Sequence, residues 1–306
     1  MKPRVVFAAD LGGTKLACAV VDGKGKILAR RTEPVDTSSP KAPIAQIARI
    51  TKELRGHSKY SAAGIAVPGL ARRDGTVWAP NLPDWERMPL ARLLRAHLKI
   101  PVVVDSDRNA VVLGEAWRGA ARGMSDVIVL IVGTGIGAGI LSGGRLIRGA
   151  HELSGCAGWL CITDDESALA RKIGSLESSA AGPAIARIAN LALKKCALRN
   201  DSSALTTEHV ADMARRGDRT AREIFRAAGH LLGLGVANLI SLFDPEVVVL
   251  TGGLTNAADL FVDELQSTAL SRSQPLIAGQ VKIRVSRLQS KANLLGAAKL
   301  ALGMKN

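Results

Sequence analysis

Aromatic residues and cysteines are both scarce in this chain of 306 residues. Phe, Trp and Tyr together make up 3%, and the four cysteines, at positions 18, 156, 161 and 196, have no regular spacing. This pattern excludes a disulfide scaffold and leads us to expect a reducing, cytoplasmic setting. No apolar run reaches membrane-spanning length without Gly or charge, and no basic-then-apolar leader is evident. No membrane partner is therefore expected.

The net charge of +14 is not accompanied by the features of a nucleic-acid binder. There is no terminal basic arm, and basic residues such as Arg92, Arg95, Lys194 and Lys195 are spread over predicted helices. Proteins that bind nucleic acids gather basic residues on one face, often beside aromatic stacking residues. General solubility explains the charge better, and no nucleic-acid partner is expected.

What the chain does have is apolar residues, at 47%, and 31 glycines. Its length allows two compact lobes with separate cores.

Residues 5–21 form two short apolar runs around a polar turn, which predicts strand, turn and strand. Gly12 and Gly13 would let backbone N–H groups approach a phosphate, and Asp10 could hold magnesium directly or through water. A plain hairpin with a polar tip remains the alternative.

The same order of elements occurs twice along the chain. In the first copy, a hairpin and a strand at 26–32 precede helices at 42–54, 90–98 and 108–118, with strands at 62–67 and 101–105 between them. The second copy begins at Asp126 with strands at 127–132, 138–141 and 145–148. Helices at 184–195 and 219–242, strands at 246–250 and 281–285, and a helix from Lys291 follow. Internal duplication of a mixed sheet with helices on both faces is predicted. The two glycine turns would then face each other across a cleft.

Several spaced motifs together resemble the ROK family of repressors, open reading frames and sugar kinases. They are Asp10-Leu11-Gly12-Gly13-Thr14-Lys15, Pro80-Asn81-Leu82-Pro83, Asp107-Arg108-Asn109-Ala110, Gly133-Thr134-Gly135-Ile136-Gly137, Asp244-Pro245-Glu246 and Thr251-Gly252-Gly253. The resemblance implies a duplicated actin-like ATPase (ribonuclease H-like) α/β fold with two lobes and a central cleft. The expected lobes are residues 1–118 with 291–306, and residues 119–290.

The resemblance implies ATP- and Mg²⁺-dependent phosphorylation of a sugar hydroxyl. The residues implied to hold the nucleotide and its phosphates are Asp10, Gly12, Gly13, Thr14, Lys15, Gly133, Thr134, Gly135, Gly137, Gly252 and Gly253, with Asp10 also on the metal side. Those expected at the sugar are Asn81, Ser106, Asp107, Cys156, Trp159 and Glu177.

Asp107 is the candidate general base. Phosphoryl transfer needs a group that accepts the proton of the attacking hydroxyl. A carboxylate just beyond the end of a strand, where a helix begins, is well placed for that role in an α/β cleft. The alternative is that Asp107 only caps the helix from residue 108.

The sugar-binding motif departs from the family pattern. Ser106 stands where family kinases have an asparagine, and Cys156 and Trp159 replace the Glu and His of a Gly-Glu-Ile-Gly-His segment, whereas Glu177 is kept. Each lost hydroxyl partner costs about 1–3 kcal/mol. Glucose should therefore bind more weakly, by roughly a hundredfold or more, than it would with both groups of the family pattern in place. Trp159 is either core filling or a stacking platform for a sugar face.

The family's structural zinc site is not expected in this chain. That site uses the missing His and three cysteines, and no CxxC pair is present. Cys156 and Cys161 with His151 nearby suggest a metal site, but small buried cysteines explain them better.

Three functions were weighed against these motifs. A sugar kinase is favoured because the base and both phosphate turns are kept, and the alternative is a non-catalytic nucleotide or sugar sensor. A repressor is not expected, since the phosphate hairpin begins within ten residues of the start and leaves no room for a winged helix.

The apolar pattern at residues 231–239 suggests either a core helix or the contact face of a homodimer.

Overall fold

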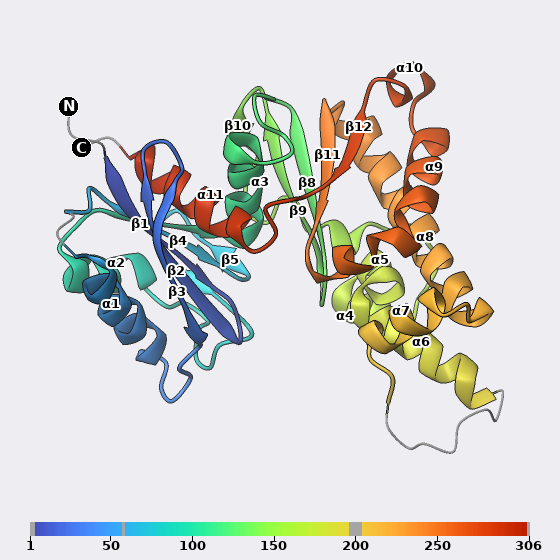
Figure 1. Ribbon diagram of the computed structural model, residues 1–306, viewed down its shortest axis with the longest axis horizontal. Helices are drawn as coiled ribbons and strands as arrows, with labels where there is room; N and C mark the ends of the chain where they lie inside the picture. The colour runs from blue at the N-terminus through green and yellow to red at the C-terminus, as the bar shows by residue number, and fades with distance from the viewer. Residues whose placement is uncertain (1–3, 57–58, 196–203, 305–306) are drawn as a thin grey trace. The chain divides into compact units, whose positions relative to one another are not determined.

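The computed structural model describes residues 4–56, 59–195 and 204–304, and Cys196 lies outside them (Figure 1). The chain forms two compact units. Unit 1 comprises Met1–Gly123, Leu146–Ser154 and Arg287–Asn306, and unit 2 comprises Met124–Arg145 and Gly155–Ser286. The expected lobe boundaries fell after residues 118 and 290. Unit 1 also includes residues 119–123, the segment 146–154 and residues 287–290.

Unit 1 is built on a five-stranded sheet with the order β3-β2-β1-β4-β7. The first three strands pair antiparallel, and β4 and β7 continue the sheet parallel to β1. Their bounds are β1 Val5–Leu11, β2 Lys15–Asp22, β3 Ile27–Pro34, β4 Ala63–Val67 and β7 Val102–Ser106. A two-stranded ribbon, β5 (Leu70–Ala71) and β6 (Val77–Trp78), lies outside this sheet.

Alternating side chains of β1 supply two separate cores, since neighbouring residues of a strand point to opposite faces. Phe7 and Ala9 belong to one cluster, and Val6 and Ala8 belong to the other. The first cluster includes residues of α1 (Ala42–Leu54) and α2 (Leu90–Leu98), namely Ile44, Ile47, Ile50, Leu90 and Leu94. The second includes residues of α3 (Asp107–Arg118) and α11 (Lys291–Leu302), namely Ala110, Leu294, Leu295, Ala297, Ala298 and Ala301.

The second core of unit 1 is made of small residues, which brings backbones into direct contact. A Cβ added at Gly296 of α11 would lie 1.6 Å from the carbonyl oxygen of Ala110 in α3. One added at Gly64 of β4 would lie 1.9 Å from the carbonyl oxygen of Ala297. Helix α11 is therefore held tightly between α3 and the sheet.

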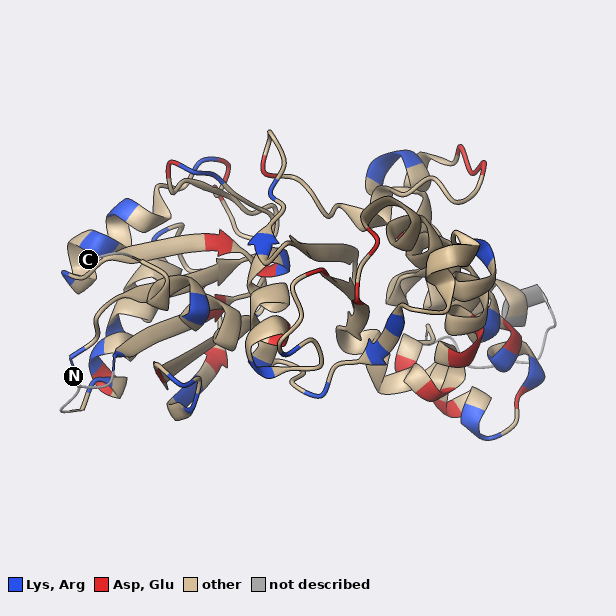
Figure 2. Ribbon diagram, turned by 90° about the horizontal axis from the view of Figure 1, so that it is seen from above, with Lys and Arg blue, Asp and Glu red and all other residues tan. Residues whose placement is uncertain are grey.

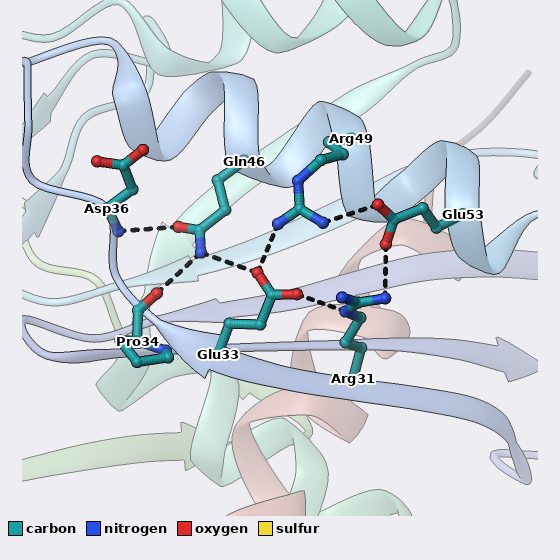
Figure 3. A network of polar contacts seen from close by, with 7 residues as sticks. All are labelled: Arg31, Glu33, Pro34, Asp36, Gln46, Arg49 and Glu53. Atoms are coloured by element: carbon teal, nitrogen blue, oxygen red, sulfur yellow. Dashed lines mark hydrogen bonds and ion pairs between the residues drawn. The ribbon is translucent and has the colours of Figure 1, made fainter.

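The edge strand β3 is joined to α1 by a polar network (Figure 3). Glu33 accepts hydrogen bonds from Arg31, Arg49 and Gln46, and Glu53 pairs with both arginines. The hydrogen bonds from Arg49 and Gln46 are the main causes that lower the pKa of Glu33 to about 2. Exposed ion pairs add little stability, so the network chiefly covers a sheet edge that would otherwise be open to pairing.

Unit 2 repeats the sheet of unit 1 in the order β10-β9-β8-β11-β12. In both sheets an antiparallel three-strand meander is followed by two strands parallel to its first strand, so the duplicated mixed sheet is confirmed. The bounds are β8 Val127–Val132, β9 Ile136–Ser142, β10 Arg145–Leu146, β11 Val247–Thr251 and β12 Lys282–Val285. The sequence placed the start of β9 at residue 138 and extended β10 to 148. Both limits are wrong, because pairing of Ile136 with Val132 closes the turn earlier and β10 is two residues long.

The other elements of unit 2 are helical. They are η1 Ala157–Trp159, α4 Ala168–Ile173, α5 Ser175–Ala180, α6 Gly182–Lys195, α7 Thr207–Arg215, α8 Arg219–Phe243, η2 Gly253–Leu260, α9 Val262–Arg272 and α10 Pro275–Ala278. Helix α8 is long and apolar enough to cross a membrane, but most of its apolar part is buried within the protein. Such burial is typical of the core helix of a soluble protein.

Charged residues of both signs occur along the described parts of both units. Figure 2 shows Lys and Arg scattered over the helices and loops of both units, with Asp and Glu between them.

Candidate active site

In unit 1, two carboxylates lie at the carboxyl ends of β1 and β7. Asp10 is the penultimate residue of β1, and Asp107 follows directly after β7. Burial raises the pKa of Asp10 to about 7, and the negative charge of Asp107 raises it further against the opposing effects of Asn293 and Lys15. Asp107 is thus close enough to influence the ionisation of Asp10.

Asp107 is the first residue of α3 and does not cap it. The N-cap is Ser106, whose Oγ accepts a hydrogen bond of 3.3 Å from the backbone N–H of Asn109. Asp107 Oδ1 accepts from the N–H of Arg108 at 2.8 Å. The prediction that Asp107 caps the helix is therefore wrong, since Ser106 already accepts the hydrogen bond from the N–H of Asn109. Burial raises the pKa of Asp107, and the positive charge of Arg108 acts in the opposite direction.

The first glycine turn is closed by a hydrogen bond from the N–H of Gly12 to the carbonyl oxygen of Lys15, 2.9 Å long. Asn81 lies against this turn, because a Cβ added at Gly13 would be 3.1 Å from the Cβ of Asn81. Thr14 and Lys15 are exposed at its tip. Unit 1 thus brings the predicted residues of the turn together with Asn81.

Asp10 should make the stability of the protein depend on pH. In the folded state its pKa is about 7, against 3.8 ordinarily, so between these values the folded protein binds more protons than the unfolded chain. Stability is then lost as pH rises through this window. Asp10→Asn removes the effect, so the variant should gain stability relative to wild type between pH 5 and pH 8, by at most about 4 kcal/mol.

Thermal unfolding of both proteins at pH 5 and pH 8, without divalent cations, measures this difference. A difference in melting temperature between variant and wild type that stays constant across that range would contradict a raised pKa for Asp10.

In unit 2, the second glycine turn is Gly133-Thr134-Gly135, closed by a 3.0 Å hydrogen bond from the N–H of Gly133 to the carbonyl oxygen of Gly135. Gly137 lies within β9, opposite Ile131. A Cβ added at Gly133 would approach the backbone nitrogen of Gly253 at 3.5 Å. The predicted second turn and the Gly252-Gly253 pair therefore lie side by side.

Gly252 is required at its position by both its backbone angle and its surroundings. Its φ is +99°, and an added Cβ would lie 2.4 Å from the carbonyl oxygen of Val132. Helix α6 is anchored next to the turn, since the N–H of Gly182 donates to the carbonyl oxygen of Gly133 at 2.9 Å. Thr207 Oγ1 donates in turn to the carbonyl oxygen of Gly182 at 2.8 Å.

These elements surround a cavity of about 470 Å³. It is lined by the second turn, by η2 and by α6 and α7, with Pro183, Ala186, Thr206, Thr207, Glu208, Ala211, Asp212, Arg215, Leu254, Asn256 and Ala257 on its walls. Arg215 is fixed at one side by hydrogen bonds to Asp259, of 2.7 and 3.0 Å, and to the carbonyl oxygen of Asn256. The volume falls within the range of small-molecule binding sites.

Glu177 packs against Gly135 of the second turn and against Gly158, the residue before Trp159. Glu177 Oε2 accepts a 2.7 Å hydrogen bond from the N–H of Ile136, and burial raises its pKa. Trp159 is 57% exposed, so core filling is wrong as an account of this side chain. Cys156, three residues earlier, is half-buried.

The cysteines do not fit the buried environment expected for them. Of the three described, only Cys18 is buried, and Cys161 is exposed. Within residues 4–56, 59–195 and 204–304, no group of three or more His, Cys, Asp and Glu side chains is arranged to hold a metal ion.

Two parts of this site were missed by the sequence interpretation. Asn293 Nδ2 donates a 3.2 Å hydrogen bond to Asp10 Oδ1 across 283 positions of sequence. Its only signal is an amide in the first turn of a helix that is apolar apart from Lys291 and Lys299. The residues of α6 and α7 that line the cavity carry no motif at all.

Comparison with known proteins gives consistent matches over nearly the whole chain. The ROK family model matches residues 6–304. A glucokinase from Thermotoga maritima is 31% identical, over 96% of this chain and 96% of its own length. A ROK hexokinase from Thermus thermophilus has a TM-score of 0.85 at 31% identity, over 97% of each chain. A ROK family glucokinase from Streptomyces griseus, in complex with glucose and AMPPNP, has a TM-score of 0.80 at 29% identity, over 97% of this chain and 99% of that one.

Proposed function

The chain belongs to the ROK family and is an ATP-dependent sugar kinase, and we propose that Asp107 is its general base. Asp107 Oδ accepts the proton of a sugar hydroxyl while the hydroxyl oxygen forms a bond to the γ-phosphorus of ATP. The bond from that phosphorus to the β,γ-bridging oxygen breaks, and ADP leaves with the electron pair. The half-buried carboxylate pair Asp10 and Asp107 supports this proposal most directly, since partial loss of solvation raises the proton affinity of the proposed base.

Asp10 is the residue we propose for a magnesium ion. Carboxylate oxygens suit this cation, which is usually held by one or two carboxylates and by substrate phosphates. The negative charge of Asp107 adds to desolvation in raising the pKa of Asp10, so a cation beside these two half-buried carboxylates would relieve an unfavourable interaction. Bound magnesium would neutralise charge on the phosphates. Asn293 would keep Asp10 Oδ1 in place.

The nucleotide is proposed to bind in the cavity of unit 2, with its phosphates at the second turn. Helix α6 begins at Gly182, beside Gly133, and the amino end of a helix attracts phosphate. In unit 1, Gly12, Gly13, Thr14 and Lys15 are proposed to contact phosphate as well. Gly252 and Gly253 would lie beside the nucleoside.

Filling this cavity should therefore prevent nucleotide binding. Ala186 lines the cavity from α6, and Ala186→Trp would occupy much of its volume. The affinity for a non-hydrolysable ATP analogue with magnesium should fall at least about tenfold. Leu191→Trp is the matched control, because it lies on the same helix and its side chain is 52% exposed.

Calorimetric titration of the three proteins measures this effect, and their melting temperatures show whether they remain folded. Unchanged affinity in folded Ala186→Trp would place the nucleotide elsewhere.

The sugar is proposed to be bound by Asn81, Ser106, Asp107, Cys156, Trp159 and Glu177. The exposed indole of Trp159 supports a stacking surface for an apolar sugar face. Ser106 has its hydroxyl engaged in capping α3, and Glu177 already accepts from the second turn. Fewer polar groups are thus available to hydroxyls than in the family pattern. We infer a substrate other than glucose, either a different sugar or a sugar-like alcohol.

The setting of the enzyme follows from its chemistry and composition. We propose a cytoplasmic enzyme that acts on a small molecule without a nucleic-acid partner or bound zinc. A homodimer remains a prediction, and α8 gives it little support, because Leu232, Val236 and Leu239 are buried within unit 2.

A further inference from the structure

A second cavity, of about 270 Å³, lies in unit 1 beside the edge strand β7. Four arginines line it, Arg72, Arg73, Arg95 and Arg148, with only two carboxylates, Asp105 and Glu152. Four guanidinium groups against two carboxylates leave an excess of two positive charges. Neither Asp10 nor Asp107 lines this cavity, which distinguishes it from the catalytic carboxylates.

The arginines of this cavity are held in place by bonds that use a minority of their donors. Arg148 Nη2 pairs with Asp105 at 2.5 Å, and Arg73 Nε pairs with Glu152 at 2.9 Å. Arg95 donates through Nε and Nη2 to the carbonyl oxygen of Val102, at 3.4 and 3.2 Å. Each guanidinium carries several further N–H groups. A planar fork of this kind suits the oxygens of a phosphate.

We propose that this cavity binds a small phosphate-bearing molecule. Its volume is slightly below the roughly 300 Å³ at which drug-sized sites begin, so it would accept inorganic phosphate or a short phosphorylated compound rather than a nucleotide. The positive excess favours an anionic ligand. Two of the arginines are already oriented by carboxylates, so little ordering is needed on binding.

This site is connected to the start of α3 through Asp105. Asp105 Oδ1 accepts from the N–H of Ser106 at 2.8 Å and from Asn109 Nδ2 at 2.7 Å, while Oδ2 faces Arg148. An anion that draws Arg148 away would therefore act on the turn that precedes Asp107. This effect on turnover rests on the proposed function, whereas the binding itself does not.

Calorimetric titration with sodium phosphate, and separately with glucose 6-phosphate, tests the site in the intact protein. Wild type should bind at millimolar concentration, and Arg95→Gln should lose at least about tenfold in affinity. Arg92→Gln is the control, since it lies on the same helix, is exposed and does not line the cavity. Of sodium phosphate and glucose 6-phosphate, the one that binds wild type more tightly and loses more affinity in Arg95→Gln shows whether the natural ligand is free phosphate or a phosphorylated compound.

Arg73→Gln provides a second test, because the Arg73 side chain is 78% exposed and its replacement should leave the fold intact even if Arg95→Gln does not. It should weaken binding in the same way. No binding to wild type at about 20 mM of either ligand, or equal binding in Arg73→Gln, Arg95→Gln and Arg92→Gln, would overturn the proposal.

Discussion

Asp107→Asn is expected to lower kcat by about 10²–10⁴, the usual contribution of a positioned general base, while nucleotide and sugar affinities change little. Asparagine has nearly the same shape and can still accept the hydrogen bond from the N–H of Arg108. Ser106 continues to cap α3, so the helix should begin at the same residue. The loss is then confined to the proton-accepting function.

Steady-state kinetics, with binding measured separately, resolves the two effects. Asp263→Asn is a matched control, being an exposed aspartate in the first turn of α9, and its kcat should equal that of wild type. A variant at Asp107 that keeps more than about a tenth of wild-type kcat would contradict the role of general base.

Gly296→Ala is expected to destabilise unit 1 by about 1–3 kcal/mol or more. The new Cβ would fall 1.6 Å from the carbonyl oxygen of Ala110, a backbone atom that only a shift of α3 or α11 could move away. Alanine favours a helix over glycine by about 1 kcal/mol, so the steric cost must exceed this gain. Because α11 carries Asn293, the shift should also disturb Asp10.

Chemical denaturation of wild type, Gly296→Ala and Gly279→Ala measures the effect. Gly279 has no atom within 4 Å of an added Cβ and a φ of −74°, so alanine there should be neutral. A Gly296→Ala variant as stable as Gly279→Ala would show that α3 and α11 are not closely packed in solution.

The fold could be predicted wherever periodicity and local chemistry agree. Apolar residues at helical spacing gave residues 42–54 and 90–98, and both helices have these bounds. The repeated order of elements gave the duplicated sheet, because each copy must bury the same faces. The limits of β9 and β10 were wrong, since pairing across the turn, rather than residue type, decides where such strands begin and end.

The candidate site was predictable where a glycine turn marks it. Gly133 and Gly252 are far apart in sequence, yet their turns lie together, and the backbone at Gly252 leaves no room for a Cβ. Asn293, Arg215 and the four arginines beside β7 had no such marker. Their roles come from tertiary packing, which brings together side chains from separate elements such as α2, α7, α11 and the segment 146–154, and no local pattern encodes it.

Ser106 and Trp159 show how composition alone leaves roles open. Serine and aspartate are both good N-caps, and only the hydrogen bond from Asn109 identifies Ser106 as the cap. A tryptophan near apolar residues suggests a core position, and only its 57% exposure excludes that role.

Release of ADP by the wild-type enzyme, measured in a coupled assay over a panel of sugars and polyols with ATP and magnesium, tests the central claim most directly. At least one compound should stimulate ADP release above the rate with ATP alone, and glucose should perform worse than the preferred substrate by roughly a hundredfold. If ATP binds normally but no compound stimulates ADP release, the protein is not a sugar kinase, and a non-catalytic sensor takes its place.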